Sequence, residues 1–356
     1  MKSTSIVNCI FIFSALLLIF YNEFFDFHTH HSKQWSSALE TLPPKSENDV
    51  RILFVGDPQL QGASEHPVVM GSLMRWDADR YLEKYFGLAL SAFEPNVVIF
   101  MGDLIDEGSA AGDEEYSKYA KRFKSLFSVP DHVLAIYIAG DNDLGGEEGQ
   151  TITLEKVQRF ENHFSPVNEI LQYKHVRFYK MDFLPFLHQI PEPKLDKQLQ
   201  QLLTEFNQKP KDDTIRVLLS HHPIHEIMLH RHITIMQTLH PLYAFSAHTH
   251  YSGYVVHDLQ KLMKFFNNIM PSPNKGYKLD PRGNIQMEEH KIPTCNYRMG
   301  VPSTAYAIAT IDGSGELHYA LLWLPSRFQQ LRYYFLFLMA TVVFLLWKWF
   351  CRRRHR

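Results

Sequence analysis

The chain has 356 residues, of which 45% are hydrophobic and 21% are charged, a composition typical of globular proteins. This length leaves room for one large α/β domain or two small ones. Its 36 Lys and Arg residues nearly balance its 38 Asp and Glu residues, so it lacks the broad basic bias of proteins that bind nucleic acids. We therefore expect no nucleic-acid partner.

The N-terminal residues 6–25 are apolar, with Glu23 as their only charged residue. About 20 such residues span a bilayer as a helix. A cleaved signal peptide would carry small residues after its apolar core, whereas Phe20, Tyr21 and Asn22 stand there. We predict an uncleaved transmembrane helix over residues 6–25, with a cleaved signal peptide as the alternative.

A second apolar segment covers residues 331–350 and precedes the basic tail at 351–356. From Tyr333 onward it is interrupted only by Lys348, which lies two residues from its end. A lysine there reaches the membrane interface through its flexible stem. We predict a second transmembrane helix over residues 331–350.

The arginines of the basic tail and Lys2 flank the two predicted spans on one side, which indicates that both ends are cytosolic. Residues 26–49 are then a lumenal stem, and residues 50–325 form a lumenal domain. Cys295 is the only cysteine in that domain, and a domain of this size builds a core without disulfides.

Within residues 50–325, short apolar runs rich in Val and Ile are typical of buried strands. We expect strands at Val50–Val55, Val97–Met101, 133–139, 176–181, 215–220 and 243–247, helices at 78–93, 114–127 and 195–206, and a hairpin about Asp312 and Gly313. Alternating strands and helices predict parallel, right-handed crossovers. The fold class that we predict is α/β, with two packed β-sheets flanked by helices.

Five of the apolar runs end in side chains that bind metals. These side chains are Asp57, Gln59, Asp103, Asp141, His221, His248 and His250. Because α/β sheets gather their functional groups at the carboxyl ends of the strands, we expect the seven to converge. They are too many for one metal and suit two. Two cations about 3.5–4 Å apart activate water and clamp a phosphoryl group.

The five motifs resemble those of the calcineurin-like metallophosphoesterase superfamily, whose pattern is D-x-H, G-D-x-x-D, G-N-H-[DE], H-x-P and G-H-x-H. The matching segments here are D-P-Q at 57–59, G-D-L-I-D at 102–106, G-D-N-D at 140–143, H-H-P at 221–223 and A-H-T-H at 247–250. The resemblance covers about residues 50–325. It implies a metallophosphoesterase domain that hydrolyses phosphoric esters.

The resemblance also implies a role for each ligand. Asp57, Gln59 and His250 would hold the first metal, Asp103 would bridge both metals, and Asp141, His221 and His248 would complete the second site. Ligation rich in carboxylate oxygen favours Mn²⁺, with Mg²⁺, Fe or Zn²⁺ as alternatives.

Three positions depart from the family's pattern. Gln59 stands where the family has His, and Asp141 stands where it has Asn. Asn142 stands where the family has its catalytic His, which contributes general acid catalysis worth about 10²–10⁴-fold. Asn142 donates a hydrogen bond but no proton, and His222 and His66 are the nearest candidates to replace the acid. We expect Asp141 and Asn142 to be catalytic positions, with an inactive relative as the alternative.

The two spans resemble the membrane branch that removes ethanolamine phosphate from the mannose core of glycosylphosphatidylinositol (GPI) anchors. The resemblance implies a role in endoplasmic reticulum exit and transport to the Golgi. The expected partners are the GPI glycan, GPI-anchored proteins and the lipid bilayer, with coat or cargo-receptor contacts through the basic tail. The expected location is a multi-pass position in membranes of endoplasmic reticulum exit sites, the intermediate compartment and the cis-Golgi.

Two other functions stay open from the sequence. One is a membrane-bound metallophosphatase that acts on nucleotides or lipids, and the other is a non-catalytic protein that binds cargo.

The segments K-V-x-R-F at 156–160 and C-N-Y-R at 295–298 also match the membrane branch. Arg298 suits bidentate binding of a substrate phosphate, or else a surface ion pair.

Overall fold

The computed structural model describes residues 2–63, 68–146, 150–183, 204, 214–224, 236, 239–258 and 286–354. His66 and all but one residue of the predicted helix at 195–206 lie outside the described residues. The chain divides into two compact units. One unit comprises residues Met1–Ser37 and Trp323–Arg356, and the other comprises Ala38–Leu322.

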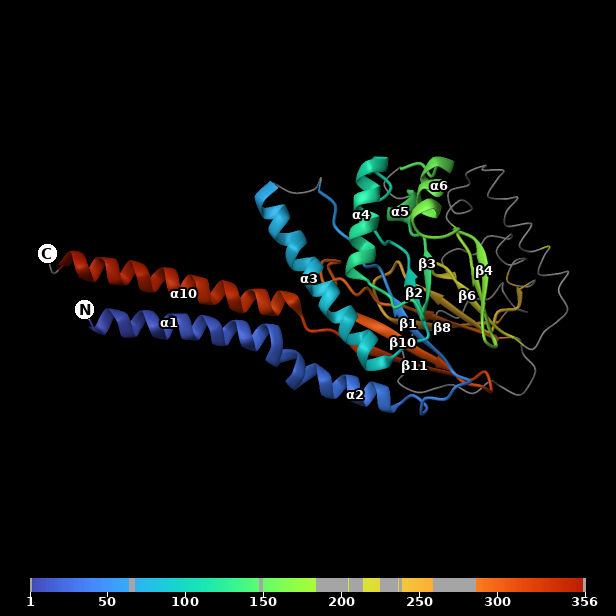
Figure 1. Ribbon diagram of the computed structural model, residues 1–356, viewed down its shortest axis with the longest axis horizontal. Coiled ribbons are helices and arrows are strands. Elements are labelled where there is room, and N and C mark those ends of the chain that lie inside the picture. Colours follow the sequence, from blue (N-terminus) through green and yellow to red (C-terminus); the bar gives the residue numbers. More distant parts are fainter. Residues whose placement is uncertain are drawn as a thin grey trace. The chain divides into compact units, whose positions relative to one another are not determined.

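The first unit contains the two apolar helices predicted at the chain ends (Figure 1). Its elements are α1 (Lys2–Phe20), the π-helical turns η1 (Tyr21–Phe25) and η2 (Phe27–His31), and α10 (Arg327–Arg354). The stretches Val7–Phe25 and Arg327–Phe350 are long and apolar enough to cross a membrane, with 6% and 0% of their residues buried. A core helix of a soluble protein would be mostly buried, so these helices suggest membrane association.

Polar groups join these two helices where the apolar stretches end. The Asn22 side chain donates to the Gln330 carbonyl at 3.2 Å, and the Gln330 side chain donates to the Asn22 carbonyl at 3.0 Å. Arg327 Nη1 lies 2.8 Å from Glu23 Oε1. These reciprocal contacts connect η1, directly after α1, with the first turn of α10.

The predicted stem at residues 26–49 is helical up to Glu40, through η2 and α2 (Ser32–Glu40). Phe27, His31 and Trp35 recur at every fourth position and therefore share one helix face. The Phe27 and Trp35 rings meet edge to face at 5.0 Å, and Trp35 Nε1 donates to the Trp323 carbonyl.

The first sheet of the second unit has the strand order β11-β10-β1-β2-β3. Its strands are β1 (Val50–Val55), β2 (Val97–Met101), β3 (Leu134–Ile138), β10 (Ala305–Ile311) and β11 (Leu317–Trp323). The predicted strands and the predicted terminal hairpin are confirmed. Strands β1, β2 and β3 are parallel, so their carboxyl ends lie along one edge.

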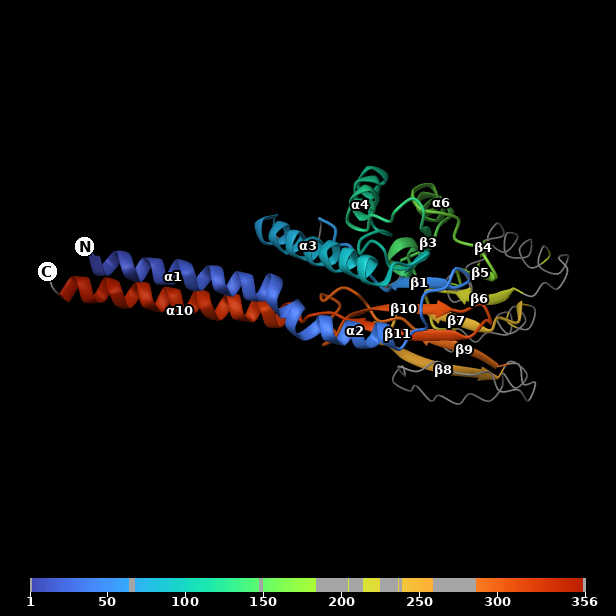
Figure 2. The ribbon, with the colours of Figure 1, turned by 60° about the horizontal axis from the view of Figure 1, so that its bottom comes forward.

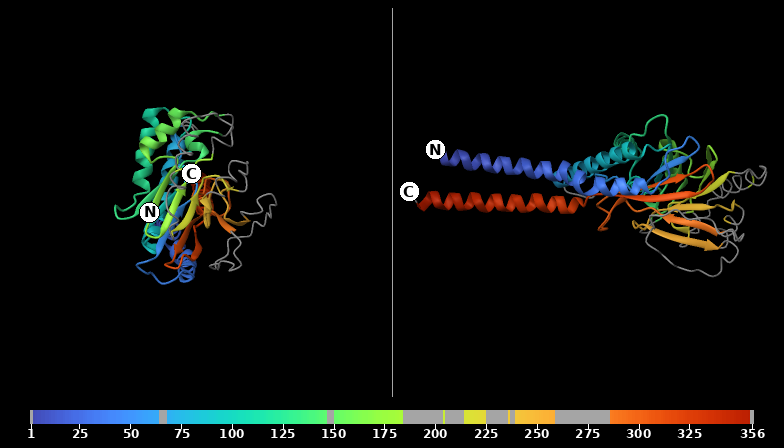
Figure 3. Two further views of the ribbon diagram at one scale, coloured as in Figure 1. Left: turned by 90° about the vertical axis from the view of Figure 1, so that its right-hand side faces the viewer. Right: turned by 90° about the horizontal axis from the view of Figure 1, so that it is seen from below.

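The second sheet has the order β4-β5-β6-β7-β9-β8. Its strands are β4 (Glu169–Tyr173), β5 (Val176–Lys180), β6 (Ile215–Leu219), β7 (Tyr243–Ser246), β8 (Gly253–Asp258) and β9 (Gln286–Lys291). The rings of Phe54 in β1 and Phe245 in β7 lie 4.3 Å apart, so side chains of the two sheets interdigitate. Two mixed sheets flanked by helices are the predicted fold, seen from three directions in Figures 2 and 3.

Helices α3 (Val68–Phe93), α4 (Asp113–Leu126) and α6 (Leu154–His163) flank the first sheet. The predicted start of the first of these, at residue 78, was wrong by ten residues. The buried stripe of α3 begins near Ala78, whereas Met70 and Trp76 in its earlier turns are each 57% exposed. Periodic burial therefore marks where this helix packs and not where it begins.

Candidate metal centre

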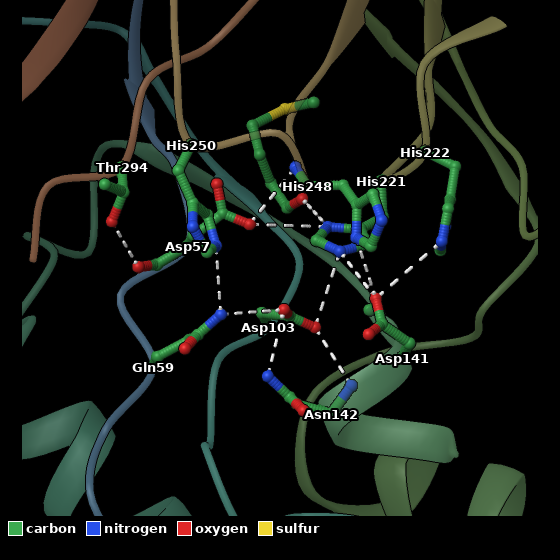
Figure 4. Close-up of polar contacts among 12 residues, drawn as sticks. Asp57, Gln59, Asp103, Asp141, Asn142, His221, His222, His248, His250 and Thr294 are labelled. Carbon is green, nitrogen blue, oxygen red and sulfur yellow. Dashed lines mark hydrogen bonds and ion pairs between the residues drawn. The ribbon is translucent and has the colours of Figure 1, made fainter. Parts of the chain in front are cut away.

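Three carboxylates and one carboxamide follow the parallel strands of the first sheet. Asp57 and Gln59 follow β1, Asp103 follows β2, and Asp141 opens the short helix α5 (Asp141–Leu144) after β3. All four side chains are buried. The three strands end at one edge of the sheet, so the side chains converge as predicted (Figure 4).

The second sheet contributes the imidazoles. His221 follows β6, and its Nε2 lies 3.0 Å from Asp141 Oδ1 and 3.4 Å from Asp103 Oδ1. His248 follows β7, and its Nδ1 lies 3.2 Å from the same Asp141 oxygen. The backbone N–H of Ala247 donates to the His221 carbonyl at 2.8 Å, which joins the two loops. The structure therefore places carboxylates from one sheet against imidazoles from the other.

The remaining predicted ligands lie on the other side of Asp103. Gln59 Nε2 donates to Asp103 Oδ2 at 3.0 Å and lies 3.3 Å from His250 Nε2. The backbone N–H of His248 donates to Asp57 Oδ1 at 3.2 Å. All seven side chains predicted as metal ligands thus belong to one connected cluster.

The groups that could each hold one cation differ partly from the predicted ligand sets. Ligand atoms of Asp57, Asp103 and His221 lie within 4.8 Å of one another, and so do those of Asp141, His221, His222 and His248. His222 joins the second group although the sequence assigned it no ligand role. The two groups share His221, so they lie side by side.

The donor set fits a pair of divalent cations. Asp57 Oδ2 is buried and has no hydrogen-bond partner among the described residues. Burial raises the pKa of Asp57 to about 7, and the neighbouring Asp103 carboxylate adds to this against the pull of His221. Burial likewise raises the pKa of Asp103. A bound cation would compensate these buried negative charges.

The imidazoles differ in charge according to their neighbours. Burial opposes protonation of His221, but the Asp103 and Asp141 carboxylates outweigh it and raise its pKa. Burial alone would raise the pKa of Asp141, but hydrogen bonds with His221 and His248 lower it. Burial and the nearby imidazoles lower the pKa of His250 to about 4. His250 is therefore neutral at neutral pH, the form that binds metals.

The backbone at these positions is strained. Five of the seven predicted ligands have positive φ, namely Asp57 at 39°, Gln59 at 37°, Asp103 at 50°, and His248 and His250 at 64°. Non-glycine residues rarely adopt this conformation, and it concentrates at functional sites. Two glycines make room: a Cβ on Gly102 would lie 2.3 Å from His221 Nδ1, and one on Gly140 would lie 2.1 Å from Asp103 Oδ1.

Sequence reasoning missed the residues that hold the loops. Asp143 accepts hydrogen bonds from the backbone N–H groups of Leu104, Ile105 and Gly140. Asn296 Nδ2 donates to the Pro58 and Gln59 carbonyls, and Thr294 Oγ1 donates to the Asp57 carbonyl. The available signal was the polar segment at 295–298, which sequence analysis noted without assigning Asn296 a role.

The departures from the family pattern also face Asp103. Asn142 donates to Asp103 twice, from its backbone N to Oδ1 at 3.0 Å and from its side-chain Nδ2 to Oδ2 at 3.1 Å. His222 Nε2 lies 3.8 Å from Asp141 Oδ1, and its ring lies 4.1 Å from that of His248. The Arg298 backbone N–H donates to Asn296 Oδ1, and a phosphate contact by its side chain stays a prediction.

Comparisons with known proteins agree with this geometry. Residues 50–252 match the family model described as Calcineurin-like phosphoesterase. A Caenorhabditis elegans protein named Metallophosphoesterase 1 homolog is 31% identical over 151 residues, which cover 42% of this chain and 38% of that protein. A protein of Ailuropoda melanoleuca named Metallophosphoesterase 1 is 26% identical over 144 residues, which cover 40% and 35%. The matches thus span less than half the length of these relatives.

One solved structure is described as GAP50, the anchor in the inner membrane complex of Plasmodium. It aligns with 78% of this chain and 85% of its own, with 10% sequence identity and a TM-score of 0.46.

The raised pKa of Asp57 predicts a pH-dependent stability in the metal-free protein. Between its ordinary pKa of 3.8 and about 7, the folded state binds a proton that the unfolded state has released. The carboxyl group therefore costs more stability as pH rises through this window. In the presence of a chelator, the unfolding temperature of Asp57→Asn minus that of the wild type should therefore increase as pH rises from about 4 to about 7. Thermal unfolding of both full-length proteins in micelles measures this, and parallel pH profiles would contradict it.

Asp103 belongs to one group of ligands and lies 3.4 Å from His221 Nε2, the imidazole that both groups share, so its loss should affect both. We expect Asp103→Asn to lower bound metal from two ions per chain towards none. The matched control is Asp113→Asn, since that side chain is 95% exposed and lies in the same unit. Metal analysis after equilibration with Mn²⁺ measures both variants. Wild-type metal content in Asp103→Asn would rule out a metal pair centred on this carboxylate.

Proposed function

Because the chain belongs to the calcineurin-like phosphoesterase family, we propose that it is a metal-dependent phosphodiesterase that removes ethanolamine phosphate from the mannose core of GPI anchors. The observation that carries the proposal is the convergence of seven oxygen and nitrogen ligands in a chain that has an apolar helix at each end. A phosphoester hydrolase held at both ends by a bilayer suits a substrate that resides in the same leaflet.

The chemistry at the site follows from the side chains. Two bound divalent cations would lower the pKa of a water and offset the negative charge of the phosphoryl group. Asp103 contributes a carboxylate to the group with Asp57 and His221, and Asp141 contributes one to the other group that stays ionised beside His221 and His248. These charges are fixed in place before substrate arrives, which removes the cost of reorganising the site during the reaction.

Asn142 has a positioning task in this proposal. Its carboxamide lies beside Asp103 and donates hydrogen bonds, but a carboxamide has no proton to transfer. His222 has no ligand role in the family pattern, and its Nε2 lies 3.8 Å from Asp141 Oδ1. We assign to His222 the protonation of the leaving oxygen, the step that the family's histidine performs.

The cellular setting in the proposal comes from the charges that flank the helices. The basic residues beyond the second helix favour a cytosolic C-terminus and a lumenal domain. In the early secretory pathway, such a domain would meet newly made GPI-anchored proteins before they leave for the Golgi. The basic tail would then face coat or cargo-receptor proteins.

The alternative is a non-catalytic role in binding cargo, and two replacements in the site are the observation behind it. Gln59 and Asn142 replace two imidazoles of the family pattern, and Gln59 turns its amide nitrogen towards Asp103 and His250. If the chain binds no metal, these hydrogen bonds would only stabilise the fold, and the site would have no catalytic role. Metal content therefore separates this alternative from the proposed hydrolase.

The substrate is tested with the purified full-length chain in micelles with Mn²⁺. We expect release of ethanolamine phosphate from a GPI glycolipid at a kcat/KM at least about 10²-fold above that for a soluble nucleotide diester, a modest requirement since matched polar groups can discriminate by about 10⁴–10⁵-fold. Asp141→Ala should abolish turnover, while Asn142→Ala should cost about 10²–10³-fold, the loss of one hydrogen-bond donor. Equal rates on both substrates would point to a general membrane phosphatase instead.

Orientation is tested by adding protease to intact microsomes. A lumenal domain predicts that only the tail around residues 351–356 is cleaved and that residues 50–325 are protected until detergent is added. An epitope inserted after Gly300, a glycine whose Cβ position has open space, reports on the domain. Cleavage of that epitope in sealed microsomes would reverse the orientation and exclude a lumenal glycolipid substrate.

A further inference from the structure

A buried carboxylate lies behind the imidazoles of the metal centre and belongs to none of the five motifs. It is Glu289 of β9, whose side chain has no exposed surface. Strand β9 pairs with β7 on one side and with β8 on the other. A carboxylate with this burial needs donors around it, because an ionised group without partners is strongly destabilising in the protein interior.

One oxygen of Glu289 accepts hydrogen bonds from both segments that carry imidazole ligands, the loop after β6 and the last residue of β7. The Ile224 backbone N–H donates to Oε1 at 2.7 Å, and Ser246 Oγ donates to the same atom at 2.6 Å. Ile224 lies three residues after His221, and Ser246 lies two residues before His248. A single oxygen atom therefore ties the end of β6 to the end of β7.

The other oxygen is held from the opposite side. His257 Nε2 of β8 lies 2.7 Å from Glu289 Oε2, and the His257 ring is buried. Donors thus occupy both carboxylate oxygens, and the carboxylate is fixed between three strands. Charge-assisted hydrogen bonds of this kind are short and set geometry more firmly than neutral ones.

We propose that Glu289 is a positioning residue that sets the spacing of His221 and His248 and thereby the affinity of the metal site that they share with Asp141. Asp143 makes the equivalent connection between the loops of the first sheet, where it accepts from Leu104 and Gly140. The inference depends on the metal centre and not on the identity of the substrate.

The test compares two substitutions of Glu289 in the full-length protein in micelles. Glu289→Met keeps a similar volume and removes both acceptors, so Mn²⁺ affinity at one of the two sites should fall about 10–100-fold, the loss typical when a partner of a metal ligand is removed. Glu289→Gln keeps an acceptor oxygen for Ile224 and Ser246 and should restore most of the affinity. Glu288→Met on the same strand is the matched control, with Mn²⁺ affinity unchanged.

A purely structural role predicts a different result. Both Glu289 substitutions would then lower the unfolding temperature in chelator while Mn²⁺ affinity at both sites stayed at the wild-type value, and that result would overturn the proposal. If Glu289→Met does not fold, Ser246→Ala removes only one of the donors that the described residues give to Glu289. Its Mn²⁺ affinity should fall at the same site, and the double variant Ser246→Ala with Glu289→Gln should show less than the sum of the two effects.

The measurement also distinguishes this inference from the proposed hydrolase function. Mn²⁺ titration needs no substrate, so a wild-type protein that binds two metals but leaves the GPI glycolipid intact would refute the function alone. A wild-type protein that binds no Mn²⁺ would refute the positioning role together with the metal centre.

Discussion

The burial of three carboxylates at one edge of the first sheet is the constraint on which the rest of the site depends. Asp57, Asp103 and Asp141 are nearly inaccessible to water, and burial raises the pKa of the first two. An ionised carboxylate in such a place is tolerated only when a cation or several donors compensate its charge. The backbone is also strained at Asp57 and Asp103, which have φ of 39° and 50°. Each such residue costs about 1–3 kcal/mol, which the surrounding hydrogen bonds must offset.

The two sheets contribute opposite charges to the site. The first sheet carries the carboxylates, and the second carries His221 and His248, whose raised pKa values favour the imidazolium form when no metal is bound. Asp141 and these two imidazoles therefore attract each other across the interface between the sheets. A metal pair would replace this attraction with shared coordination. In either state the metal centre joins the sheets, as the Phe54–Phe245 contact does within the core.

Much of the fold and the seven ligands were predictable because both depend on local patterns. A buried strand is visible as an apolar run, and the residue that follows it lies at the edge of the sheet, as with Val97–Met101 and Asp103. The supporting residues were not predictable in this way. Asn296 holds a loop 238 residues earlier in the chain, and Glu289 contacts residues 43 and 65 positions away. No sequence spacing encodes these contacts, which only the packing of the strands creates. The early start of α3 was missed because its first turns have no stripe of buried apolar residues, so no local pattern marks them.

The three departures from the family pattern together change the ligand charge of the site. Gln59 and Asn142 each replace an imidazole by a carboxamide, and both amide nitrogens donate to the same atom, Asp103 Oδ2. Both carboxamides are neutral, so neither replacement adds a charge to the site, and their two donors stabilise the charge of the Asp103 carboxylate. Asp141 replaces an amide by a carboxylate and adds a negative charge beside His221 and His248. Relative to the family pattern, ligand charge is thus unchanged at the first predicted metal position and more negative at the second. The second position is also the one whose imidazole ligands Glu289 would hold, through Ile224 and Ser246.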